Sequence, residues 1–111
     1  MKIFRSLEEA SIVNSFEVLD FKKFDGGYYI KIKAFLSDHT ELYVREYVDE
    51  KIRDYSYHWQ KQNGEMIIRW DNSPHHKKVS TFPHHKHQNN DIQESKEITL
   101  DDILKSINKN L

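Results

Sequence analysis

The chain has 111 residues, of which 37% are hydrophobic and 32% charged, with a formal net charge of −1 and no cysteine. This length suits one domain, residues 1–111, and leaves no room for two independent cores. The lack of cysteine excludes disulfides and thiolate metal sites. No apolar run is long enough to span a membrane or to act as a signal peptide, so we expect a cytoplasmic protein with no membrane partner.

A short helix is predicted near residues 6–14. Ser6 and Glu9 have the spacing of a capping box, in which each side chain bonds the backbone N–H of the other residue. Leu7, Ala10 and Val13 would then share the face that packs on a core. The sequence therefore predicts a helix ahead of the first strand.

Beyond Phe16 the hydrophobic period changes to two, which is typical of β-strands. The strand-like stretches are separated by short turn sequences: DGG at 25–27, SDHT at 37–40 and NG at 63–64. Antiparallel hairpins joined by such turns form a meander. We expect about five strands between residues 16 and 72.

The C-terminal segment TLDDILKSINKNL, residues 99–111, predicts an amphipathic helix. Thr99 and Asp102 match a second capping box. An apolar stripe at helical spacing follows, made of Leu100, Ile103, Leu104, Ile107 and Leu111. With residues 88–98 as a polar linker, the predicted fold class is α+β: an antiparallel meander sheet of about five strands, a short N-terminal helix and a C-terminal amphipathic helix.

Glu46 interrupts a strand face that is otherwise apolar. A carboxylate in that position is costly unless it is paired. Strand twist or an ion pair with a lysine would account for it structurally. The functional alternative is a buried general base or a metal ligand.

His58 lies opposite to Tyr57 and Trp59 in its strand, so we expect it on the polar face with Arg69 of the next strand. Cross-strand neighbours on one face are close enough to act together. Arg45, with Tyr43 and Tyr47 on either side, belongs to the same face. An ordinary half-exposed surface is one interpretation, and a phosphate- and base-binding surface is the other.

Residues 75–87 hold five of the seven histidines and three lysines, with no acidic residue. A metal site would need convergent ligands, for which the candidates are Asp71, His75, His85 and His87. The interspersed lysines argue against a cation there, and clustered histidines and lysines also suit proton transfer and anion binding. A solubilising surface loop is the third alternative. In an extended segment, His85 and His87 would share one side and His84 and Lys86 the other.

Five segments of the chain resemble the TumE family, the toxins of type II toxin–antitoxin pairs. They are VREYVD (44–49), YSYHWQ (55–60), IIRWDNSPHH (67–76), TFPHHKH (81–87) and ITLDDIL (98–104). They occur in the order of the family and cover about the last two-thirds of the chain. The resemblance implies a small toxin that is neutralised by an antitoxin carrying a helix-turn-helix DNA-binding domain.

We therefore expect a ribonuclease toxin that needs no metal or other cofactor, in which a 2′-hydroxyl attacks the adjacent phosphate. The expected proton-transfer residues are His85, His87, His58 and Glu46. The expected substrate-binding residues are Arg45, Tyr47, Tyr57, Arg69, His75, His76, His84 and Lys86.

Two alternatives remain open. One is a metal-dependent hydrolase that uses the His/Asp set named above. The other is a binding protein without turnover, whose basic loop docks on the antitoxin or on a nucleic acid.

An aromatic sheet with only two short helices to cover it also favours a homodimer.

Overall fold

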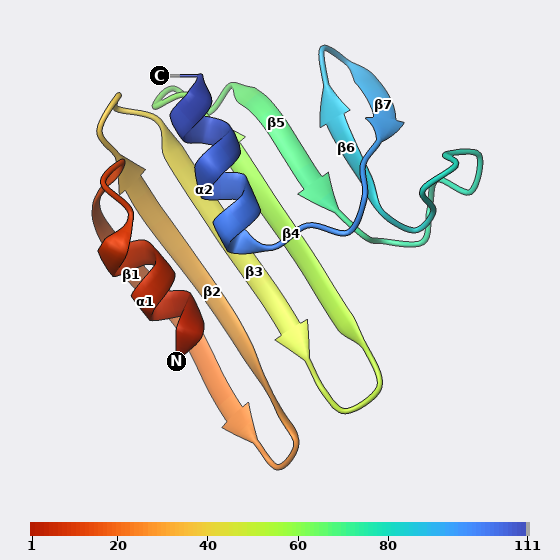
Figure 1. Cartoon of the computed structure of the whole chain (residues 1–111), viewed down its shortest axis with the longest axis horizontal. Helices are drawn as coiled ribbons and strands as arrows, with labels where there is room; N and C mark the ends of the chain where they lie inside the picture. Colours follow the sequence, from red (N-terminus) through yellow and green to blue (C-terminus); the bar gives the residue numbers. More distant parts are fainter. Residues whose placement is uncertain (111) are drawn as a thin grey trace.

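A computed structural model describes residues 1–110 and folds them into one antiparallel sheet with two helices (Figure 1). The elements in chain order are α1 (Lys2–Glu9), β1 (Val13–Phe24), β2 (Gly27–Leu36), β3 (Glu41–Val48), β4 (Arg53–Gln60), β5 (Met66–Asp71), β6 (His85–Gln88), β7 (Asp91–Glu94) and α2 (Leu100–Lys109). Each strand pairs with the next along the chain, so the α+β class and the meander are confirmed. Neither helix of residues 1–110 has the length and apolar character needed to cross a membrane.

The sheet has seven strands, and the prediction of about five was wrong because the segment 85–94 is a hairpin. Its turn residues Asn89 and Asn90 have φ angles of 55° and 60°. Two consecutive residues in that region make a tight hairpin turn, and asparagine tolerates this conformation well. The predicted linker 88–98 therefore contains β7. Its strands are polar on both faces, so hydrophobic alternation gave no signal.

Helix α1 begins four residues earlier than predicted. Met1 is its N-cap and makes no side-chain capping bond, while Ser6 lies inside the helix. A capping serine must have an extended backbone, so the predicted box with Glu9 cannot form. The helix starts early because Ile3 and Leu7, four residues apart, both bury their side chains in the core.

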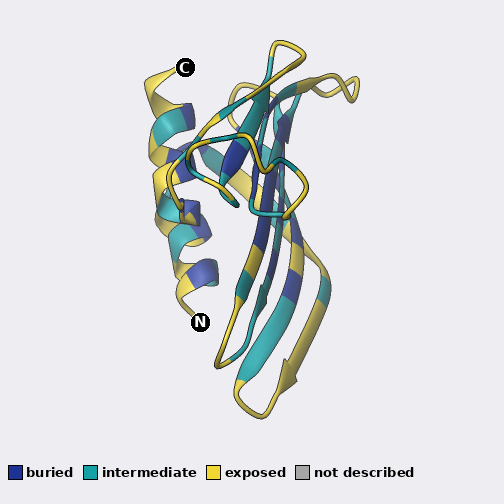
Figure 2. Cartoon of the chain, turned by 90° about the vertical axis from the view of Figure 1, so that its right-hand side faces the viewer, coloured by how far each residue is buried: buried dark blue, intermediate teal, exposed yellow. Residues whose placement is uncertain are grey.

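Both helices pack on the same face of the sheet (Figures 1 and 2). The capping box of Thr99 and Asp102 is confirmed, and the buried α2 residues are Leu100, Ile103, Leu104 and Ile107. Leu111 lies outside the described residues. The side chains beneath the helices include Ile30, Ile32, Leu42, Val44, Tyr55, Tyr57, Trp59 and Trp70. One face of the sheet is thereby fully used for the core.

The opposite face carries no helix, and we call it the open face. The strand register places residues from successive strands side by side on it. One cross-strand row is Tyr43, His58, Arg69 and His87. The adjacent row is Arg45, Ser56, Asp71 and His85. Because alternate residues point to one face, these two rows form a continuous polar patch, within which Ser56, Asp71 and His85 are buried.

Candidate functional site

The open face contains a hollow of about 350 Å³ that we call the cationic hollow. It is lined by Lys31, Tyr43, Val44, Arg45, Ser56, His58 and Arg69. None of these lining side chains is acidic. A second hollow of about 180 Å³ shares Arg45 and Arg69 with the first and extends to Asp71. The two arginines therefore border a path between the cationic hollow and β5.

Three histidines meet at the end of this path, and we call them the imidazole cluster: His76, His85 and His87. His76 comes from the loop between β5 and β6, while the other two lie on β6. The ring centroids are 4.7 Å apart for His76 and His85, and 4.9 Å for His85 and His87. The expected shared side of His85 and His87 is confirmed, and the loop folds back to add the third ring.

Asp71 lies beside the imidazole cluster and is 5% exposed. Its Oδ1 accepts hydrogen bonds from the backbone and hydroxyl of Ser73, and its Oδ2 accepts one from Arg69 Nε at 3.1 Å. Burial alone would raise the pKa of Asp71, but the bonds from Ser73 and the nearby His85 and Arg69 lower it below its ordinary value. A negative charge is therefore fixed next to the rings.

The local environment favours the neutral form of two open-face histidines, His87 and His58. Burial, assisted by the neighbouring His85, His76 and Arg69, lowers the pKa of His87, although Asp71 opposes the shift. Burial and Arg69 also lower the pKa of His58. A neutral imidazole has one nitrogen with a free lone pair, which can accept a proton or bind a metal ion.

Glu46 lies on the other face of the sheet, beneath the helices, and is 7% exposed. Its carboxylate accepts hydrogen bonds from the hydroxyls of Tyr28, at 3.0 Å, and Tyr57. Arg53 Nη2 is 2.7 Å from the Tyr57 hydroxyl and 4.0 Å from Glu46 Oε2. This network belongs to the core. Glu46 therefore lies on the opposite face of the sheet from His58, His85 and His87, with which it was predicted to transfer protons.

Tyr57 is part of the same network and is completely buried. Burial and the negative charge of Glu46 raise the pKa of its hydroxyl. The predicted role of Tyr57 in base binding needs an accessible ring face, which this position does not provide. Tyr47 does lie on the open face, where its ring stacks on Phe24 with 5.7 Å between centroids.

The remaining candidates of the basic segment divide between the two faces. His84 stacks on Tyr55 and its Nδ1 is 2.8 Å from the Tyr55 hydroxyl, on the helix side. Lys86 pairs with Trp70 and points to that side as well. His75 is exposed in the loop, and His76 takes the place that the sequence gave to His75. Lys31 and Ser56 were missed, although the alternation of YYIKIKAFL already put Lys31 on the polar face.

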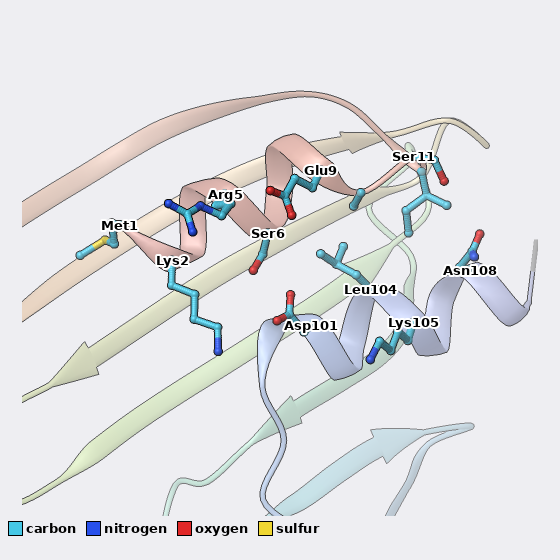
Figure 3. A pocket seen from close by; sticks show the side chains of 12 residues that line it. Met1, Lys2, Arg5, Ser6, Glu9, Ser11, Asp101, Leu104, Lys105 and Asn108 are labelled. Atoms are coloured by element: carbon cyan, nitrogen blue, oxygen red, sulfur yellow. The ribbon is translucent and has the colours of Figure 1, made fainter.

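A further cavity lies away from these groups. It has a volume of about 610 Å³ and lies between α1 and α2 (Figure 3). Its charged lining residues are Lys2, Arg5, Glu9, Asp101 and Lys105, and it contains no histidine. Positive and negative side chains occur together there, as on an ordinary helix–helix surface. The arginines and histidines that could act on a substrate lie instead on the open face.

A comparison with known protein families gives a match over nearly the whole chain. The family described as Toxin TumE matches residues 3–111. No curated protein and no solved structure matches. The family match covers all five segments that carried the resemblance and extends beyond them to β1 and almost all of α1. The chain therefore belongs to the TumE family of toxins.

Proposed function

We propose that this toxin cleaves RNA on its open face, where the cationic hollow meets the imidazole cluster. Family membership supports the toxin role and implies an antitoxin partner. The RNA substrate rests on one observation: a hollow lined by Lys31, Arg45 and Arg69 without any acid adjoins three imidazoles. Cations that hold a phosphate and imidazoles that act on it are the parts that phosphodiester cleavage requires.

The cationic hollow is suited to the backbone of a single strand. Arginine forks bind phosphate oxygens in a bidentate manner, and lysine adds charge with little directional preference. Tyr43 and His58 lie in the same hollow with their ring centroids 6.4 Å apart. Aromatic rings beside a basic groove are the usual means of stacking unpaired bases. Tyr47 adds another ring one step further along β3.

The imidazole cluster supports two forms of cleavage. In the metal-free form, one of His85 and His87 removes the 2′-hydroxyl proton and the other protonates the leaving 5′-oxygen, with His58 as the next candidate. The products are a 2′,3′-cyclic phosphate and a 5′-hydroxyl, and cleavage persists in EDTA. In the metal-assisted form, chelation stops cleavage. The convergence of three ring nitrogens favours the second form, for the reasons given in the next subsection.

The test is expression of the chain alone and together with its antitoxin, with growth and RNA integrity as readouts. We expect RNA fragmentation and growth arrest for the chain alone, and neither with the antitoxin. His87→Ala should abolish both effects and still form the antitoxin complex, whereas His75→Ala, at an exposed position outside the cluster, should behave as wild type. Growth arrest with intact RNA contradicts the proposal. Loss of the antitoxin complex in His87→Ala with RNA fragmentation retained indicates a docking role.

Two features of the partners remain our inference. The first is that the antitoxin carries a helix-turn-helix domain, which predicts that the gene adjacent to the toxin gene encodes such a domain. The homodimer draws support from β1, an edge strand that exposes Val18, Leu19, Phe21 and Phe24. Sedimentation of the toxin alone and with antitoxin separates self-association from antitoxin binding at this edge.

A further inference from the structure

The nitrogens of the imidazole cluster are arranged as a set of ligands. One ring nitrogen from each of His76, His85 and His87 lies within 4.8 Å of the others. The rings meet edge to face, with interplanar angles of 70° to 76°. Rings packed for apolar contact alone could turn their nitrogens outward to water. Here the nitrogens converge on one point on the open face.

His85 shows which of its nitrogens is available. Its Nδ1 lies 2.9 Å from the backbone carbonyl of Pro83, which can only accept a hydrogen bond, so Nδ1 carries the proton. Nε2 is then the nitrogen that is free to bind an ion. A backbone carbonyl that orients a histidine through its other nitrogen is the usual outer-shell arrangement at metal sites.

Nε2 of His85 is buried and has no hydrogen-bond partner within residues 1–110. It nevertheless lies 2.9 Å from Asp71 Oδ1. At that distance a proton shared along the line between them would make a hydrogen bond, but the ring is not aligned for one. With Nδ1 bonded to the Pro83 carbonyl, Nε2 is the nitrogen left for an ion, and a cation bound there would also be attracted by the Asp71 carboxylate.

We propose that His76, His85 and His87 bind a divalent transition metal of the zinc class, with the Asp71 carboxylate as its anionic neighbour. Imidazole nitrogens select Zn²⁺ and related ions, while Mg²⁺ prefers oxygen ligands. Three protein ligands with one position left open is the pattern of catalytic zinc sites. The metal site itself needs no RNA, whereas its part in cleavage rests on the proposed function.

The lysines that argued against a metal from the sequence do not stand among the ligands. Lys86 points to the helix side of β6, and Lys77 and Lys78 are exposed in the loop. Arg69 is the nearest cation, and it is held by Asp71 through the 3.1 Å bond from Nε. No lysine therefore lies among the three proposed ligands.

Metal binding is tested on the full-length toxin after release from its antitoxin. We expect one zinc per chain by elemental analysis, and a visible absorption band on titration of the metal-free protein with Co²⁺. His76→Ala, which removes a half-buried loop side chain, should weaken Zn²⁺ binding by at least about 100-fold, the upper end of what loss of an outer-shell partner costs. His75→Ala, one residue away and exposed, is the matched control and should bind as wild type.

The outcomes separate the two proposals. No stoichiometric Zn²⁺ or Co²⁺ uptake by the wild-type chain, or equal affinity in His75→Ala and His76→Ala, overturns the metal site. RNA cleavage by protein shown to be metal-free overturns the part of the metal in cleavage and leaves both the ribonuclease proposal and the metal-binding site standing. Stoichiometric binding that depends on His76, with no RNA cleavage by the metal-loaded toxin, supports the metal site and overturns the ribonuclease proposal.

Discussion

Two buried carboxylates on opposite faces of one sheet have opposite surroundings. Glu46, beneath the helices, is surrounded by groups that donate to it: the hydroxyls of Tyr28 and Tyr57, and Arg53 nearby. Asp71, on the open face, receives bonds from Ser73 and Arg69 but also faces a ring nitrogen that has no proton aligned toward it. Both are almost equally buried, at 7% and 5% exposure.

The difference shows how to tell a buried carboxylate that stabilises the fold from one that takes part in a functional site. Burial alone marked Glu46 as a candidate catalytic group, yet its partners satisfy it completely and tie β2, β3 and β4 together. Asp71 has partners and an unsatisfied neighbour as well. A buried carboxylate whose oxygens all accept hydrogen bonds from the protein stabilises the fold. A buried carboxylate beside side chains that still lack a partner is a candidate for a functional site. Four experiments test whether Glu46 and Asp71 differ in this way.

The largest effect is expected for Glu46→Ala on stability. It leaves the buried Tyr57 hydroxyl and the half-buried Tyr28 hydroxyl without their acceptor, and it removes a carboxylate 4.0 Å from Arg53 Nη2. Breaking a fully buried ion pair costs about 3–5 kcal/mol, and because the Arg53 side chain is 24% exposed we expect about 2–4 kcal/mol. Urea unfolding followed by tryptophan fluorescence measures this loss. An unchanged free energy of unfolding together with lost RNA cleavage would return Glu46 to the catalytic residues.

Asp71→Asn should reduce RNA cleavage by about 100-fold, because the amide keeps the shape and removes the charge that faces the imidazole cluster. Zinc content should fall in parallel. The matched control is Glu46→Gln, the same carboxylate-to-amide change on the other face, which should keep wild-type cleavage per folded molecule. Initial rates on a fluorescent RNA, normalised to folded protein by circular dichroism, give the comparison. Equal rates for both variants contradict the assignment of Asp71.

Arg45→Ala should weaken RNA binding by about 10-fold, the effect of losing one charge-assisted contact of about 1.4 kcal/mol. The dependence of affinity on salt should also flatten by about 0.7 in the log–log slope, the value for one phosphate on a single strand. Fluorescence anisotropy with a 2′-O-methyl RNA measures both without cleavage. Arg5→Ala, on exposed α1, is the control; if its effect equals that of Arg45→Ala, RNA does not bind specifically on the open face.

The smallest effect concerns alkaline stability on the Glu46 side. Burial and the Glu46 charge raise the pKa of Tyr28 to about 12, above the value of about 10 expected in the unfolded chain. The folded state therefore holds its proton longer, and the stability that this contributes is complete below pH 10 and lost as pH rises through 12. The free energy of unfolding should fall less steeply between pH 9 and 11 in Tyr28→Phe than in wild type, with Tyr29→Phe on the open face as control. Equal slopes for wild type and Tyr28→Phe contradict this coupling.

Much of the sheet could be predicted because hydrophobic alternation and glycine-containing turns report directly on half-buried strands. The hairpin 85–94 could not be predicted in this way, since neither of its strands alternates, and only the Asn89-Asn90 pair signals the turn. The start of α1 was missed for another reason. It depends on which side chains reach the core, and the burial of Ile3 outweighed the local capping preference of Ser6.

The sequence predicted many of the residues of the candidate site but less of how they are arranged in space. Alternation along β6 separates His85 and His87 from His84 and Lys86, and the structure confirms this division. The choice of His76 over His75 depends on the path of a loop, which no local pattern encodes. The satisfaction of Glu46 by Tyr28 and Tyr57 required the register of three strands, so the sequence left it as one of several interpretations.

The neighbour-to-neighbour order of the strands also governs how the molecule is made. During synthesis the sheet can grow one strand at a time from β1, and all three residues of the imidazole cluster belong to the second-last strand and the loop before it. A chain still emerging from the ribosome therefore lacks the cluster until residue 87 has left the tunnel, and α2 closes the core only after that. Under the proposed function, a truncated product that ends before β6 lacks the imidazole cluster and should not cleave RNA.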